Sequence, residues 1–182
     1  MRLYAGWNLP GIGADSAEDW QAAVAAGVPM GGELPAAPAD TGPQMLVQAN
    51  RDPVGANLDR IQVIKGWIDA AGVTHERVHD VAWSDARELD AAGALPPVGN
   101  TVNLATGEWD NSIGAARLAA LWQDPDFDPA QAAFYYVRVL QIPTPRHSLL
   151  DALALRRPEA EGYPSTLQER AYTSPVWYRP AR

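Results

Sequence analysis

The stretch that decides the fold is LDRIQVIKGWIDAAGVTHERVHDVAW, residues 58–83. Its two arms, residues 58–68 and 73–83, alternate between apolar and polar side chains and are rich in β-branched residues, which predicts two antiparallel strands. The short segment between the arms ends in Gly72, a residue that suits a tight turn. The stretch therefore predicts a long β-hairpin.

Further strands are expected on both sides of this hairpin. The strongest is Ala133–Ile142 (AFYYVRVLQI), whose two apolar faces predict a central position in a sheet. A tyrosine just inside it, after a turn rich in Pro and Asp, resembles the tyrosine corner of immunoglobulin-like sandwiches. Weaker strand patterns occur at residues 3–7, 44–49, 100–104, 108–113 and 171–178, and helical composition at residues 20–26, 114–122 and 147–156.

About seven strands with two or three short helices predict a mainly β fold, an immunoglobulin-like two-sheet sandwich. The 182 residues suit a single domain. Residues 1–43 are rich in loops, and we expect this N-terminal segment at a junction with a domain upstream.

Composition excludes several kinds of partner. The net charge of −8 and the isoelectric point near 4.7 disfavour binding to a nucleic-acid backbone. No apolar run approaches a membrane span, and the first residues lack the apolar core of a signal peptide, so no membrane partner is expected. With no cysteine, disulfides and thiolate metal sites are excluded.

The histidines do not predict a metal site. His75 and His79 lie on one face of the predicted second arm, about 13 Å apart at about 3.3 Å per residue, too far to share an ion. We interpret them as surface residues. His147 stands alone at a predicted helix start, where a cap or a surface position is the simplest interpretation.

Three aspartates, Asp124, Asp126 and Asp128, resemble the opening of a calcium loop. Pro129 and Tyr135 occupy the positions where that loop needs Gly and a bidentate Glu. The aspartates therefore remain weak candidates for a looser calcium site, and their alternative role is to cap turns. No nucleophile elbow and no phosphate loop is present, so no catalytic and no cofactor-binding residue is predicted.

Aromatic side chains supply the candidates for an interface. The chain has seven tryptophans, several of them at predicted element ends, where they pack corners, form a domain interface or stack on sugars. The interface candidates are Trp7, Trp20, Trp177, Tyr178, Glu169 and Arg170. Glu169 and Arg170 are expected to form a buried ion pair that fixes the last strand; a general acid at Glu169 is the alternative, but nothing selects a partner for it.

Several runs resemble the C-terminal part of a large bacterial family, domain of unknown function 3604. They are residues 27–31, 58–68, 78–84, 98–104, 124–146 and 168–178. The resemblance implies that this chain follows a barrel similar to the polymerase-and-histidinol-phosphatase (PHP) hydrolases, which holds divalent metal, and that the parent protein is exported or periplasmic. No segment here matches the metal ligands of such barrels. Relatives often have an aromatic residue where this chain has His147.

The resemblance predicts a non-catalytic accessory domain that braces or covers the hydrolase barrel. Its partner is then that barrel or a second copy of the chain, and a patch with Trp7, Trp177 or Tyr178 is exposed in the isolated chain. Two alternatives stay open: a module that binds glycans or proteins, and a small stand-alone hydrolase.

Overall fold

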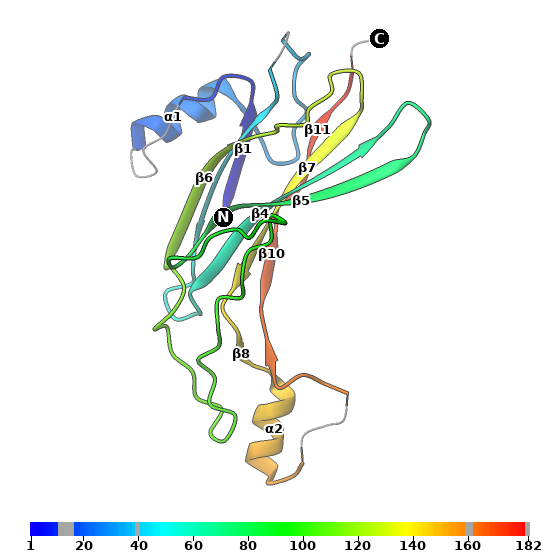
Figure 1. Cartoon of the computed structure of the whole chain (residues 1–182). Helices are drawn as coiled ribbons and strands as arrows, with labels where there is room; N and C mark the ends of the chain where they lie inside the picture. The colour runs from blue at the N-terminus through cyan, green and yellow to red at the C-terminus, as the bar shows by residue number, and fades with distance from the viewer. Residues whose placement is uncertain (11–16, 39–40, 159–161, 181–182) are drawn as a thin grey trace.

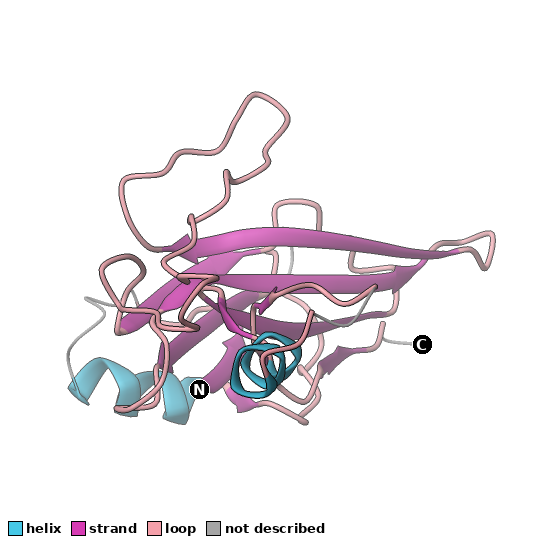
Figure 2. Cartoon of the chain, turned by 90° about the horizontal axis from the view of Figure 1, so that it is seen from below, coloured by secondary structure: helices cyan, strands magenta, loops and turns pink. Residues whose placement is uncertain are grey.

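The computed structural model describes residues 1–10, 17–38, 41–158 and 162–180, and within them the chain is mainly β. The described residues form eleven strands in three antiparallel sheets, with two short helices. None of these helices is long and apolar enough to cross a membrane. Figure 2 shows strands making up most of the molecule, with long loops projecting beyond them.

The first sheet has the order β2-β1-β3-β6. Its strands are β1 (Arg2–Gly6), β2 (Val28–Pro29), β3 (Gln44–Asn50) and β6 (Arg117–Gln123). Helix α1 (Ala17–Ala26) packs on its outer face, where Trp20 and Ala23 cover Leu46.

The second sheet has the order β10-β7-β4-β5, and β11 pairs with β7 as well. Its strands are β4 (Leu58–Ile68), β5 (Thr74–Trp83), β7 (Ala133–Gln141), β10 (Arg170–Tyr172) and β11 (Val176–Tyr178). The predicted hairpin is confirmed as β4 and β5, with an irregularity between Ile61 and Gln62. The predicted central strand is confirmed as β7.

A smaller lobe lies at one end of the molecule (Figure 1). It contains the short ribbon of β8 (Thr144–Pro145) and β9 (Thr166–Leu167) and helix α2 (His147–Leu155). The long loop between β5 and β6 reaches this lobe, where Gly107 lies against Leu150 and Leu153 of α2.

The core lies between the two main sheets, as expected for a sandwich. Val47 from β3 meets Ile61 and Val63 from β4 and Val137 from β7, all of them fully buried. Buried positions alternate along β7, in the period-two pattern that predicts a strand, whereas β4 is buried over most of its length. The prediction of a mainly β sandwich is therefore confirmed.

Four local predictions are wrong. Residues 114–122 are not a helix, because residues 117–123 pair with β3 over their whole length and this pairing overrides local helical composition. Residues 100–104 and 108–113 are not strands, because Asn100, Asn103 and Asp110 bond nearby backbone N–H groups instead of leaving them for a ladder. The last segment is two short strands rather than one.

Candidate interaction surface and buried ionic cluster

A buried ionic cluster joins the corner after β6 to strands β4 and β7. Asp124 Oδ2 lies 2.6 Å from Lys65 Nζ and accepts a hydrogen bond from the Tyr135 hydroxyl at 2.7 Å. Asp124 Oδ1 accepts from the backbone N–H of Asp126 at 3.0 Å, and Lys65 Nζ also donates to the Asp126 carbonyl at 2.8 Å. The exposed fractions of the Lys65 and Asp124 side chains are only 6% and 0%.

Burial explains why each of these groups needs the others. A lone charge in the interior is very costly, so a buried lysine and a buried aspartate persist as a pair with further hydrogen bonds. Burial, followed by the negative charge of Asp124, raises the pKa of Tyr135 far above its ordinary value, so its hydroxyl stays a donor. The tyrosine-corner expectation fails here, because Tyr135 bonds a side chain and not the backbone.

The two hairpin histidines have different environments. His75 is exposed, stacks on Trp67 with ring centroids 5.1 Å apart, and places Nε2 2.8 Å from Asp69 Oδ2. His79 is half-buried against Trp122, with ring centroids 4.8 Å apart, so its surface assignment is wrong. Burial lowers the pKa of His79, and its Nε2 is buried without a hydrogen-bond partner among the described residues.

The three candidate calcium ligands do not converge. Asp124 is held in the buried cluster, Asp126 pairs with Arg77 at the surface, and Asp128 accepts a hydrogen bond from the Ala130 N–H at 2.8 Å. Within the described ranges, no group of three or more His, Cys, Asp or Glu residues could hold a metal ion. Two of the aspartates cap turns in this corner, which is the alternative role considered above.

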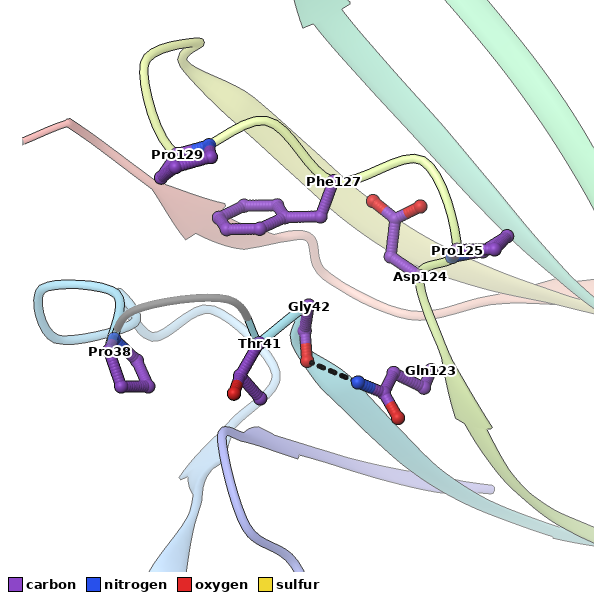
Figure 3. A pocket seen from close by; sticks show the side chains of 8 residues that line it. All are labelled: Pro38, Thr41, Gly42, Gln123, Asp124, Pro125, Phe127 and Pro129. Atoms are coloured by element: carbon purple, nitrogen blue, oxygen red, sulfur yellow. Dashed lines mark hydrogen bonds between the residues drawn. The ribbon is translucent and has the colours of Figure 1, made fainter.

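A cavity of about 620 Å³ lies beside this corner (Figure 3). Pro38, Phe127 and Pro129 line much of it, and the Gln123 amide donates to the Gly42 carbonyl across one wall. The carboxylate of Asp124 belongs to the buried cluster. Among the described residues, the lining thus offers the rings of proline and phenylalanine and the polar side chains of Thr41 and Gln123 rather than an acid–base pair.

Most of the interface candidates either pack in the interior or do not form the contact predicted for them. Trp20 and Tyr178 are buried, and half-buried Trp7 packs on Phe127 and Tyr178 with centroids 5.4 and 5.8 Å apart. The expectation that Tyr178 is exposed is therefore wrong, and Trp20, the other buried candidate, packs α1 against the first sheet.

Glu169 and Arg170 are both exposed, so they do not form the predicted buried ion pair. Trp177 is the interface candidate that lies on an open sheet face. Its exposed fraction is 43%.

Trp177 belongs to a row of rings on the outer face of the second sheet, which we call the aromatic face: Phe134, Tyr136, Tyr172 and Trp177. Ring centroids are 5.5 Å apart for Phe134 and Trp177, 6.4 Å for Phe134 and Tyr136, and 6.3 Å for Tyr136 and Tyr172. Tyr172 is 54% exposed. Gly66 opposes Phe134 across the strands, and the Phe134 ring occupies the space that a Cβ at Gly66 would need.

A cavity of about 700 Å³ adjoins the aromatic face at the end of the hairpin. Ile68, Phe134 and Trp177 line it, with the polar side chains of Glu76 and Arg179 at the same opening. Sequence reasoning missed Phe134, Tyr136 and Tyr172 as surface candidates. For Phe134 and Tyr136 the signal is their alternation with Tyr135 and Val137 in β7, a pattern that predicts a second buried face.

The described part of the chain is thus a β-sandwich with one sheet face covered by a helix and the other bearing exposed aromatic side chains. The family model of DUF3604, described as a protein of unknown function, matches residues 1–180, and the chain belongs to this family. No curated protein and no solved structure matches the chain.

Proposed function

We propose that this chain is a non-catalytic accessory domain that docks, through its aromatic face, on the PHP-like hydrolase barrel implied by the family resemblance. The immunoglobulin-like classification of the sandwich is part of the same proposal, as is the exported or periplasmic location of the parent protein. Divalent metal would be held by the barrel and not by this chain.

The aromatic face is the observation that carries the proposal. Trp177 and Tyr172 are about half exposed on an open sheet surface, and interfaces are enriched in aromatic side chains at an apolar centre with a polar rim. Glu76 and Arg179 supply polar groups beside Trp177. A patch of this kind on a protein surface marks a site of association.

The contacts of the titratable groups support a role without catalysis. Lys65, Asp124 and Tyr135 satisfy one another inside the sandwich, and Asp126 is paired with Arg77. General acid–base work needs a group that reaches a substrate, and these groups are committed to holding the corner after β6.

A direct test of catalysis is hydrolysis of phosphate and sulfate monoesters by the purified chain with Mn²⁺, Mg²⁺ or Zn²⁺. The proposal predicts turnover no faster than in solutions of the metal alone. Metal-dependent turnover that survives further purification would establish the stand-alone hydrolase and remove the proposal.

The docking test is calorimetric titration of the chain into the barrel segment of a longer family member. Trp177→Ser or Tyr172→Ser should weaken binding about tenfold or more, as expected for an aromatic anchor. Val24→Ser, at an exposed apolar position on α1, is the matched control and should leave affinity unchanged. Absence of binding, or self-association of the chain that Trp177→Ser abolishes, would show that the barrel is not the partner.

A glycan-binding module is the second candidate function. The Phe134 and Tyr136 rings are nearly parallel, inclined by 14°, on the same sheet face as the exposed Tyr172 and Trp177, and exposed aromatic side chains of this kind stack on sugar rings. Titration with cellohexaose and xylohexaose, followed by tryptophan fluorescence, tests it. A saturable change lost in Trp177→Ser would favour this candidate, and an unchanged spectrum would exclude both sugars as ligands.

A further inference from the structure

The buried ionic cluster contains an amine and a carboxyl that the proposed function does not use, and the half-buried imidazole of His79 lies on the neighbouring strand β5. We propose that Lys65 and Asp124 condense to an intramolecular amide, an isopeptide bond that joins the two main sheets. Lys65 belongs to β4 of the second sheet, and Asp124 directly follows β6 of the first. The ion pair described above is the state before condensation.

The placement of the two groups carries this inference. Lys65 Nζ lies 2.6 Å from Asp124 Oδ2, and the exposed fractions of the two side chains are 6% and 0%, so solvent does not compete for either group. Lys65 is the only lysine among 14 lysine and arginine residues. An amine therefore occupies this buried position beside a carboxyl, whereas a guanidinium there would stay charged.

The remaining members of the cluster suit the reaction. The Asp126 N–H donates to Asp124 Oδ1 at 3.0 Å, and the Tyr135 hydroxyl donates to Oδ2 at 2.7 Å. His79 pairs with Val63 across the hairpin, two residues from Lys65 along β4. Its imidazole interacts electrostatically with Asp124 and Lys65, and its Nε2 is buried without a hydrogen-bond partner among the described residues.

The chemical step balances without an oxidant or a cofactor. One proton passes from Nζ to Oδ2 and leaves a neutral amine beside a neutral acid, the form that a dry interior favours. The amine lone pair attacks Cγ, a C–N bond forms, and the negative charge that develops on Oδ1 is held by the Asp126 N–H. His79 takes the next proton from nitrogen and returns it to Oδ2. The Cγ–Oδ2 bond then breaks and Oδ2 leaves as water, so amine plus acid becomes amide plus water.

Intact-mass spectrometry of the purified, denatured full chain tests the proposal. The expected mass is that of the sequence less one water. Lys65→Arg keeps the positive charge and Asp124→Ala removes the carbonyl carbon, and both variants should show their full sequence mass. In Asp124→Asn, condensation would release ammonia in place of water, so a mass lower by ammonia is a further expected result.

The single lysine allows an independent measurement. A lysine-specific protease cuts the unmodified, denatured chain once, after Lys65, whereas an amide at Nζ blocks that cut. We expect the wild-type chain to stay whole while Asp124→Ala is cleaved into two fragments. A wild-type chain of full sequence mass that is cut after Lys65 would overturn the proposal and leave the ion pair as the final state. His79→Phe should raise the fraction of chains at full mass if His79 carries the proton.

Discussion

Replacing Lys65 by methionine should be among the most damaging single changes in the core. Lys65→Met keeps most of the side-chain volume but leaves the Asp124 carboxylate buried with two partners, the Tyr135 hydroxyl and the Asp126 N–H. Because both side chains are almost fully buried, solvent does not screen the loss. Removing one partner of a buried pair costs about 3–5 kcal/mol, and we expect a decrease of that size in the free energy of unfolding.

Urea denaturation followed by tryptophan fluorescence measures this loss. The matched control is Arg77→Met, which breaks the pair with Asp126. The Arg77 and Asp126 side chains are 54% and 56% exposed, so this change should lower the free energy of unfolding by less than about 1 kcal/mol. A loss below about 1 kcal/mol for Lys65→Met as well would refute the view that the buried cluster holds the corner after β6. If Lys65 and Asp124 are joined by an isopeptide bond, Lys65→Met should cause the same large loss in the free energy of unfolding. The intact-mass measurement distinguishes the amide from the ion pair.

Three further changes test other parts of the structure. Gly66→Ala should destabilise the chain by about 1–3 kcal/mol, because the new methyl group meets the Phe134 ring; thermal melts should show a smaller loss when Phe134→Ala is already present. The depressed pKa of His79 means that the folded state disfavours its proton, so stability should be full above about pH 6.5 and fall as the pH drops below that value; urea midpoints of His79→Phe should depend less on pH there. Asp69→Ala should lower the urea midpoint, because Asp69 Oδ1 accepts from the N–H groups of Ala71 and Val73 in the hairpin turn; equal urea midpoints for variant and wild type would contradict this role.

Much of the fold is predictable from the sequence because period-two alternation of apolar and polar side chains marks extended strands. Residues 58–83 alternate over both arms, and the observed strands Leu58–Ile68 and Thr74–Trp83 agree with the predicted arms almost to the residue. Ala133–Gln141 is central as expected. The alternation fails at residues 117–123, where alanine and leucine suit either element and pairing with β3 decides the outcome.

The candidate sites were harder to predict because they depend on which residues meet across the fold. Lys65 and Asp124 are far apart in sequence, and nothing local shows that the corner after β6 folds onto β4. The spacing of Asp124 from Asp126 suggests a calcium ligand, because that spacing is local in sequence whereas the pairing of Asp124 with Lys65 is not. Conversely, Tyr178 was expected at the surface, but its hydroxyl bonds the Pro129 carbonyl inside the sandwich.

The most direct test of the proposed docking function is hydroxyl-radical footprinting of the chain, alone and mixed with the PHP-like barrel that we propose as its partner. Mass spectrometry of the oxidised peptides then reports the protection of each side chain. Docking through the aromatic face predicts protection of Trp177 and Tyr172, with Leu121 on the opposite sheet unchanged. Equal oxidation of Trp177 and Tyr172 in both samples, under conditions where the barrel is bound, would contradict it.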